Sequence, residues 1–169
     1  MAATTTPDPV QVFIGLGSNV DPERHLRFAL RALGEAGLPP ARCSSVYRSA
    51  AVGFAGDDFL NMVVECRTER SPADVEARLA AVEDAAGRDR SGPKFGPRTL
   101  DLDLLSYGRR VDAEHGLPRA DLLCYLFVLG PLAELAPDWT HPLTGETAAG
   151  RFARLAAQGP ALSRLGPLE

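Results

Sequence analysis

An alternation of leucine and aspartate in the second half of the chain restricts the fold more than any other feature. The stretch TLDLDLL places Leu100, Leu102 and Leu104 at one set of alternate positions, and Asp101 and Asp103 at the other. Successive side chains of a β-strand point to opposite faces, so this pattern predicts a strand over residues 99–105. One face of that strand belongs in a core, and the other carries two carboxylates.

The two carboxylates predict a bound cation. Asp is depleted in strands, and carboxylates at positions i and i+2 on one face lie ~7 Å apart or less and repel each other. Mg²⁺ suits such a pair, because it takes one or two carboxylates and completes its shell with water and substrate phosphates. From Asp101 and Asp103 alone, an ordinary strand with an acidic solvent face is an equal alternative.

The segment before this strand gathers positive charge in an otherwise acidic chain. Its basic residues are Arg88, Arg90, Lys94 and Arg98. Its glycines and prolines are Gly87, Gly92, Pro93, Gly96 and Pro97. A mobile anion clamp beside a metal site is the hypothesis, since phosphoryl transfer needs metal, cations and exclusion of water. A solvated basic loop paired with nearby acids is the alternative.

The other elements predict an α+β fold. Strands are expected over residues 12–16, 44–47 and 60–66, and helices over 22–34 and 72–86, with C-terminal helices over 127–136 and 147–157. Asp21 with Pro22, and Ser71, are predicted to open the two helices. The order strand, helix, strand, strand, helix, strand (βαββαβ) indicates a ferredoxin-like antiparallel sheet with both helices on one face.

The glycine-rich stretch GLGSN, residues 15–19, is interpreted as a tight turn after the first strand. It lacks the third glycine of the dinucleotide fingerprint and the Gly-Lys-Ser/Thr of a P-loop. A nucleotide-binding loop is therefore not predicted here.

Bulk properties predict one domain over residues 11–169 after a flexible tail over 1–10, because 169 residues suit a single core. The net charge of −4 gives no general attraction to nucleic acid. The apolar stretch 122–129 is too short to span a membrane, and no secretory signal is recognised, so a cytoplasmic location is expected. The three cysteines lack metal or disulfide spacing and are interpreted as buried, and the three scattered histidines as surface residues.

A family resemblance then enters through three segments: GPRTLDLDLL at 96–105, GLGSN at 15–19 and SSVYRSAAVG at 44–53. Together they resemble the hydroxymethyl-dihydropterin pyrophosphokinases of folate synthesis, over roughly residues 12–137. The resemblance implies transfer of a pyrophosphoryl group from ATP to 6-hydroxymethyl-7,8-dihydropterin, giving its diphosphate and AMP. It also implies two Mg²⁺ ions, with ATP as co-substrate.

The resemblance implies roles for individual residues. Asp101 and Asp103 would hold the two Mg²⁺ ions, and with Arg88 and Arg98 they form the expected catalytic group. The residues expected at ATP are Glu83, Arg88, Arg90, Lys94, Arg98, Leu104, Arg119 and Tyr125. Those expected at the pterin are Ser49, Ala50, Val52, Gly53, Phe59, Asn61 and Phe127.

Within the pterin set, an asparagine can offer both a donor and an acceptor to the heterocycle. Phe59 and Phe127 would stack on its two faces, although simple core packing is the alternative for both rings. Two positions depart from the family: Arg119 stands where a histidine is usual, and Tyr125 where an arginine is usual. Loss of a charged contact would slow the chemistry more than it weakens ground-state binding.

Alternatives to this function stay open. One is a paralogue that acts on a modified pterin, and another is a non-catalytic protein that binds a pterin or a nucleotide. The expected partners are small molecules, without nucleic acid or membrane, and the expected state is a monomer or weak dimer.

Overall fold

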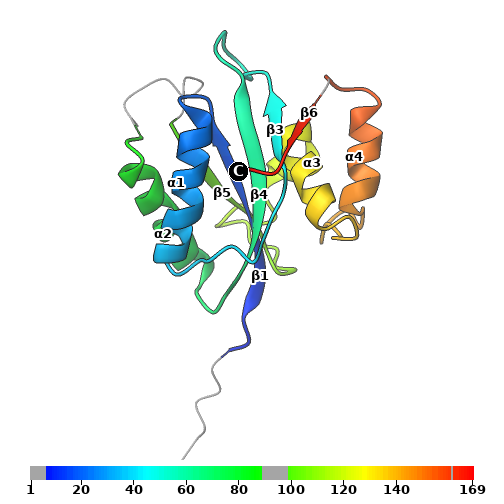
Figure 1. The fold of residues 1–169 in the computed structure, drawn as a ribbon. Helices are drawn as coiled ribbons and strands as arrows, with labels where there is room; N and C mark the ends of the chain where they lie inside the picture. Colours follow the sequence, from blue (N-terminus) through cyan, green and yellow to red (C-terminus); the bar gives the residue numbers. More distant parts are fainter. Residues whose placement is uncertain (1–6, 89–98, 161) are drawn as a thin grey trace, which may run out of the picture.

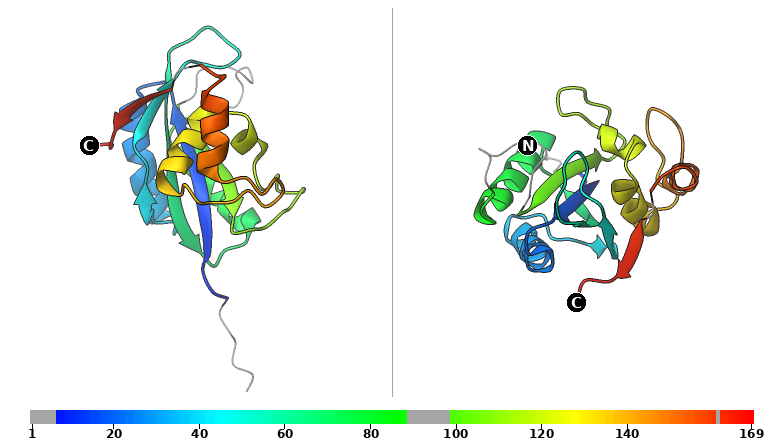
Figure 2. Two further views of the ribbon diagram at one scale, coloured as in Figure 1. Left: turned by 90° about the vertical axis from the view of Figure 1, so that its right-hand side faces the viewer. Right: turned by 90° about the horizontal axis from the view of Figure 1, so that it is seen from above.

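A six-stranded antiparallel sheet lies between two layers of helices in the computed structural model, which describes residues 7–88, 99–160 and 162–169 (Figures 1 and 2). The strands are β1 (Val10–Ser18), β2 (Arg42–Cys43), β3 (Val46–Ser49), β4 (Phe59–Thr68), β5 (Asp101–Tyr107) and β6 (Ser163–Gly166). The helices are α1 (Pro22–Glu35), α2 (Pro72–Ala85), η1, a 3-10 turn (Ala120–Leu123), α3 (Leu126–Leu135) and α4 (Ala148–Ala156). The strands run in the order β5-β1-β4-β3-β6, and β2 pairs with β4.

Each face of the sheet has its own core. The predicted helices α1 and α2 cover one face, and α3 covers the other, with α4 packed against α3 (Figure 1). Leu26 of α1 and Leu79 of α2 pack with the alternate residues of β5, while Leu129 and Leu132 of α3 pack on Phe13 of β1. The ferredoxin-like prediction is therefore confirmed, with the C-terminal helices forming a second layer.

The alternation in β5 has the predicted result. Leu100, Leu102 and Leu104 are buried in the core under α1 and α2. Asp101 and Asp103 are half-buried and face the other side, beneath the start of α3. One strand thus anchors a core and presents two carboxylates.

The two predicted helix starts behave differently. Ser71 caps α2, because its hydroxyl accepts a hydrogen bond from the Asp74 amide at 3.2 Å. Asp21 does not cap α1: its backbone is left-handed, with φ 43° and ψ 56°, and its side chain makes no capping hydrogen bond. The helix begins at Pro22 as expected, but the prediction for the Asp21 side chain is wrong.

The prediction of a tight turn at residues 15–19 is wrong as well. Gly15, Gly17 and Ser18 belong to β1, which is fully paired with β4 along this stretch. These glycines serve the site described below rather than a turn.

Three smaller expectations need correction. Cys66 is buried, but Cys43 and Cys124 are exposed. His141 is buried rather than on the surface, and its Nδ1 accepts hydrogen bonds from the amides of Leu143 and Thr144 at 3.2 and 3.3 Å. In the described part of the chain, no helix is long and apolar enough to cross a bilayer.

Candidate active site

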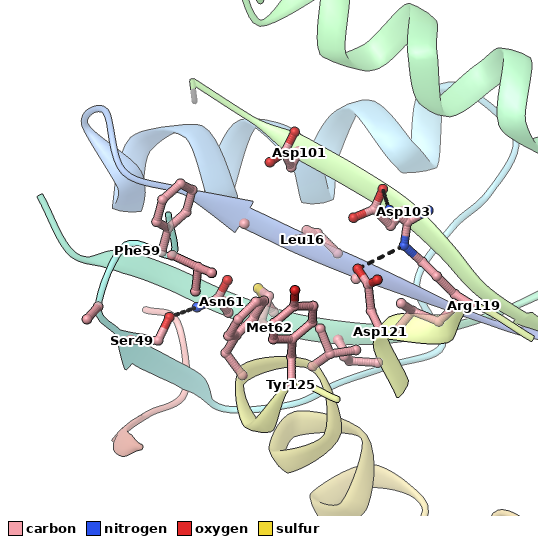
Figure 3. A pocket seen from close by; sticks show the side chains of 18 of the residues that line it. Leu16, Ser49, Phe59, Asn61, Met62, Asp101, Asp103, Arg119, Asp121 and Tyr125 are labelled. Carbon is pink, nitrogen blue, oxygen red and sulfur yellow. Dashed lines mark hydrogen bonds and ion pairs between the residues drawn. The ribbon is translucent and has the colours of Figure 1, made fainter. Parts of the chain in front are cut away.

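A cavity of about 710 Å³ opens on the α3 side of the sheet. Its walls come from β1, β4 and β5, the loop after β3, η1 and the start of α3 (Figure 3). The residues expected at the site that line it are Ser49, Ala50, Val52, Phe59, Asn61, Glu83, Arg88, Asp101, Asp103, Arg119, Tyr125 and Phe127. The structure therefore brings together residues from both halves of the chain.

Strand register places the acidic pair opposite glycines. Gly17 pairs with Asp101 on one side and Asn61 on the other, and Gly15 pairs with Asp103. A Cβ added at Gly17 would lie 3.0 Å from Asn61 Oδ1, and one at Gly15 would lie 3.4 Å from Leu105 side-chain carbons. Directly paired residues share a face of the sheet, so glycine keeps the floor between the acids and the amide open.

Each of the two carboxylates, Asp101 and Asp103, contacts an arginine side chain. Arg88 Nη1 donates to Asp101 Oδ1 at 2.7 Å. Arg119 Nη2 lies 3.4 Å from Asp103 Oδ1, and its Nε donates to Asp121 Oδ2 at 3.1 Å. The arginines neutralise part of the repulsion between the acids, which was the reason to expect a cation here.

The environment raises the pKa of Asp103 to about 6. Burial is the main cause, and the negative charges of Asp101 and Asp121 act in the same direction, while Arg119 opposes them. The ionised carboxylate is thus poorly compensated by the protein alone. A bound cation would stabilise the ionised form of this carboxylate.

Arg88 is held from the end of α2. It pairs with the buried carboxylate of Glu83, which also accepts a hydrogen bond from the Leu102 amide at 3.4 Å. Among the residues that the structure describes, the buried Arg88 Nε has no hydrogen-bond partner. A buried donor without a partner carries a desolvation cost, which the ion pairs with Glu83 and Asp101 partly offset.

The aromatic half of the cavity lies at the ends of β3 and β4. Asn61 Nδ2 donates to Ser49 Oγ at 2.8 Å, which links two of the expected pterin residues. Phe59 meets Phe54 edge to face, with centroids 6.4 Å apart and planes at 85°. In Figure 3, Phe59 and Tyr125 lie on opposite sides of Asn61.

Nine of the lining residues were not expected at the site, among them Phe54 and Asp121. Phe54 lies in the loop between β3 and β4, where its position depends on tertiary contacts. The one available signal for Asp121 was its position two residues after Arg119.

Some expected residues are not brought to the cavity. The Leu104 side chain is in the core beneath α1 and α2, on the opposite face from Asp103, so the strand pleat separates it from the expected ATP site. Gly53 is in the loop after β3 but does not line the cavity. Arg90, Lys94 and Arg98 lie outside the described residues.

Fold and site together define a ferredoxin-like α+β protein whose cavity combines an acidic pair, arginines and aromatic rings. The model of one family, 7,8-dihydro-6-hydroxymethylpterin-pyrophosphokinase (HPPK), matches residues 13–137. The chain belongs to this family.

Curated relatives agree with this assignment. The 2-amino-4-hydroxy-6-hydroxymethyldihydropteridine pyrophosphokinase of a Synechocystis species is 44% identical over 138 residues, which are 79% of this chain and 70% of the relative. The Bacillus subtilis protein of the same name is 38% identical over 128 residues, or 73% of this chain and 76% of the relative.

Solved structures support the fold independently of sequence. The wild-type HPPK-DHPS of Plasmodium falciparum matches 89% of this chain with a TM-score of 0.69 and 9% identity. This chain spans 45% of that longer chain. At such low identity the likeness shows the fold alone.

Proposed function

We propose that this protein transfers a pyrophosphoryl group from ATP to 6-hydroxymethyl-7,8-dihydropterin in folate biosynthesis. The observation that carries the proposal is that Asp101 and Asp103 face one cavity, with Arg88 and Arg119 on them and Phe59 across the floor. Family membership and the identity to named pyrophosphokinases support the same reaction.

Mg²⁺ suits the acidic half of the cavity. Asp101 and Asp103 offer hard oxygen ligands from one face of β5. Burial and the neighbouring acids raise the pKa of Asp103 despite Arg119, so a cation would stabilise its charged form. When bound, two ions would neutralise triphosphate charge and orient the phosphates for displacement.

The arginines would then exchange carboxylates for phosphates. Arg88 offers the Nη1 that lies at Asp101, and Arg119 offers the Nη edge that lies at Asp103. Guanidinium groups bind phosphate oxygens through two parallel N–H donors and stabilise charge that develops during transfer. Arg90, Lys94 and Arg98 are proposed as further phosphate contacts, with Arg98 catalytic.

The pterin would bind in the aromatic half. Asn61, oriented by Ser49, can present both a donor and an acceptor to the ring edge. Phe59 and Phe127 would stack on its faces, and Ala50 and Val52 would close the rim. In this arrangement the hydroxymethyl group would point toward Asp101 and the nucleotide.

The reaction is proposed as a direct displacement. The pterin hydroxyl oxygen attacks the β-phosphorus, the bond to the oxygen bridging to the α-phosphorus breaks, and AMP leaves while the hydroxyl proton passes to solvent. The protein positions the two substrates and excludes water, and no covalent enzyme intermediate is needed.

The decisive experiment is an assay of the purified protein with ATP, Mg²⁺ and 6-hydroxymethyl-7,8-dihydropterin, with products separated by chromatography and mass. AMP and a pterin diphosphate in equal amounts, lost with EDTA, are expected. ADP as product would contradict the proposal, and nucleotide binding without AMP would indicate a binding protein. A panel of modified pterins tests for a paralogous substrate.

The oligomeric state, a monomer or weak dimer, stays a prediction, and so does the cytoplasmic location.

A further inference from the structure

Arg119 lies between two carboxylates that belong to different elements (Figure 3). Its Nη2 is 3.4 Å from Asp103 Oδ1 on β5, and its Nε donates at 3.1 Å to Asp121 Oδ2 in η1. The two contacts use different edges of the guanidinium group. Loss of one contact therefore need not break the other.

The backbone around Arg119 is fixed at both ends. Its amide donates to Leu105 O at 2.9 Å, which ties it to β5. Its carbonyl accepts from the Leu122 amide at 3.1 Å, which closes the turn that contains Asp121. Arg119 is thus held close to both acids, to Asp121 through the turn and to Asp103 through β5.

A metal ion on Asp103 would compete directly with Arg119. Arginine and Mg²⁺ would bind the same oxygen, and the divalent ion attracts it more strongly. Without a second anchor, the displaced side chain, which is 41% exposed, would be free to leave toward solvent. Asp121 supplies that anchor at the Nε edge.

We propose that Asp121 is a positioning residue that keeps Arg119 in the cavity, so that its Nη edge turns from Asp103 to a nucleotide phosphate. Asp121 acts through Arg119 and touches no reacting atom. This inference rests on the proposed function, because it requires a metal–nucleotide complex in the cavity.

A matched pair elsewhere in the chain provides the control. Arg110 Nε donates to Asp112 Oδ2 at 3.0 Å, with the same two-residue spacing and the same atoms as the pair in the cavity. Neither residue lines the cavity. Asp112→Asn and Arg110→Gln therefore remove the same charges without reaching the proposed nucleotide.

The test is a double-mutant cycle with Arg119→Gln, Asp121→Asn and the double variant. Calorimetry measures the affinity for Mg²⁺ with α,β-methylene-ATP, an analogue that resists cleavage at the transferred bond. Asp121→Asn is expected to weaken binding by about five-fold or more, but by less than about two-fold in the Arg119→Gln background, since contacting residues couple. Asp121→Glu should restore most of the affinity.

A second measurement titrates the protein with Mn²⁺ alone, without nucleotide, and detects bound Mn²⁺ by electron paramagnetic resonance. Arg119→Gln removes the competitor for Asp103, so Mn²⁺ is expected to bind several-fold more tightly while the nucleotide analogue binds more weakly. A purely structural role would not move the two affinities in opposite directions. Circular dichroism establishes that each variant is folded.

Three outcomes would overturn the inference. Equal weakening by Asp121→Asn in both backgrounds would mean that Asp121 acts through its own charge. No effect of Asp121→Asn, or an equal effect of Asp112→Asn, would contradict a local anchoring role. A wild-type protein that binds no metal–nucleotide complex would instead refute the proposed function itself.

Discussion

Tyr125 and Phe127 stack on each other in the cavity, with ring centroids 5.0 Å apart and planes inclined by 23°. The family resemblance implies an arginine at the position of Tyr125, and the structure shows an aromatic contact there. The stack supports Phe127, one of the two rings proposed to bind the pterin. Stacked pairs contribute about 0.5–1.5 kcal/mol beyond area burial.

The first prediction separates the two possible roles of Tyr125. Tyr125→Ala should weaken pterin binding about 2- to 10-fold, because Phe127 loses its support. Tyr125→Phe should leave pterin affinity unchanged, because the ring remains. Fluorescence titration with the dihydropterin measures both. If Tyr125→Phe instead weakens nucleotide binding alone, the hydroxyl contacts ATP and the support role is wrong.

The second prediction concerns the acidic pair. Asp101→Asn and Asp103→Asn should each lower turnover by on the order of 10² to 10³, since each removes a proposed metal ligand. The rate of AMP release measures turnover, and the midpoint of thermal unfolding shows whether each variant is folded. Asp112→Asn, outside the cavity, should retain the wild-type rate. Near-normal turnover in both cavity variants would end the metal assignment.

The third prediction follows from the upward shift of the Asp103 pKa. Its pKa rises from 3.8 to about 6 on folding, so the folded protein binds this proton more tightly than the unfolded chain. Ionised Asp103 lowers the free energy of unfolding. This loss of stability is absent below about pH 4, grows as pH rises, and is complete above about pH 6. Because 39% of the side chain is exposed, screening reduces it to about 1 kcal/mol.

Asp103→Asn should therefore raise the midpoint of thermal unfolding in EDTA by about 2–4 °C at pH 7.5, and by nothing at pH 4. Asp112→Asn is the control, because the pKa of Asp112 is lowered: partial burial acts to raise it, but hydrogen bonds and charges from His115 and Arg110 prevail. That variant should gain no stability at pH 7.5. A destabilised Asp103→Asn protein would contradict the third prediction.

The fourth prediction concerns Phe54, which lines the cavity and meets Phe59 edge to face. Phe54→Ala should weaken pterin binding about 2- to 10-fold and leave nucleotide affinity unchanged. Gly56→Ala tests the same ring without removing it, because a Cβ there would clash with Phe54 Cε2 and displace the ring. Unchanged pterin affinity in both variants would place Phe54 outside the site.

The fifth prediction concerns Glu134, which joins α3 to two strands. Its carboxylate accepts from the Ser45 amide at 3.0 Å, the Ser45 hydroxyl at 2.8 Å and the Tyr47 hydroxyl at 2.6 Å, and it pairs with Arg164 of β6. Burial acts to raise the pKa of Glu134, but the hydrogen bonds from Tyr47 and Ser45 prevail and lower it. The charged form therefore stabilises the fold.

Glu134→Gln should cost about 1–3 kcal/mol at pH 7, a loss that shrinks as pH falls through the lowered pKa of the carboxyl. Denaturant unfolding at pH 7 and pH 3.5 measures the change. Arg164→Gln removes only an exposed ion-pair partner and should cost less than about 1 kcal/mol. Equal losses in the two variants would show that the ion pair, not the hydrogen bonds, carries the contribution.

Much of the fold could be predicted because its signals are local. The period of two in β5 and the apolar spacing of α1 and α2 specified both the element and the buried face. The short strands β2 and β6 carry no such signal, since two and four residues hold too few periods. They are strands because β4 and β3 offer them partners.

The site was predictable where chemistry and pattern coincide. Asp101 and Asp103 stand out because carboxylates are unfavourable on a strand without compensation. Phe54 and Asp121 do not stand out, because an aromatic residue in a loop and an acid beside an arginine are common in proteins. The pleat that exposes Asp103 turns the side chain of Leu104 into the core, so a role of Leu104 at ATP stays a prediction.

The depth of the cavity belongs to the main chain rather than to side chains. Gly15 and Gly17 have no side chain, so a substitution at either position adds a group that must displace Leu105 or Asn61. Substitutions at the rim of the cavity can change which molecules bind without this cost. Libraries intended to widen substrate choice would therefore do best to vary the loop after β3 and leave β1 alone.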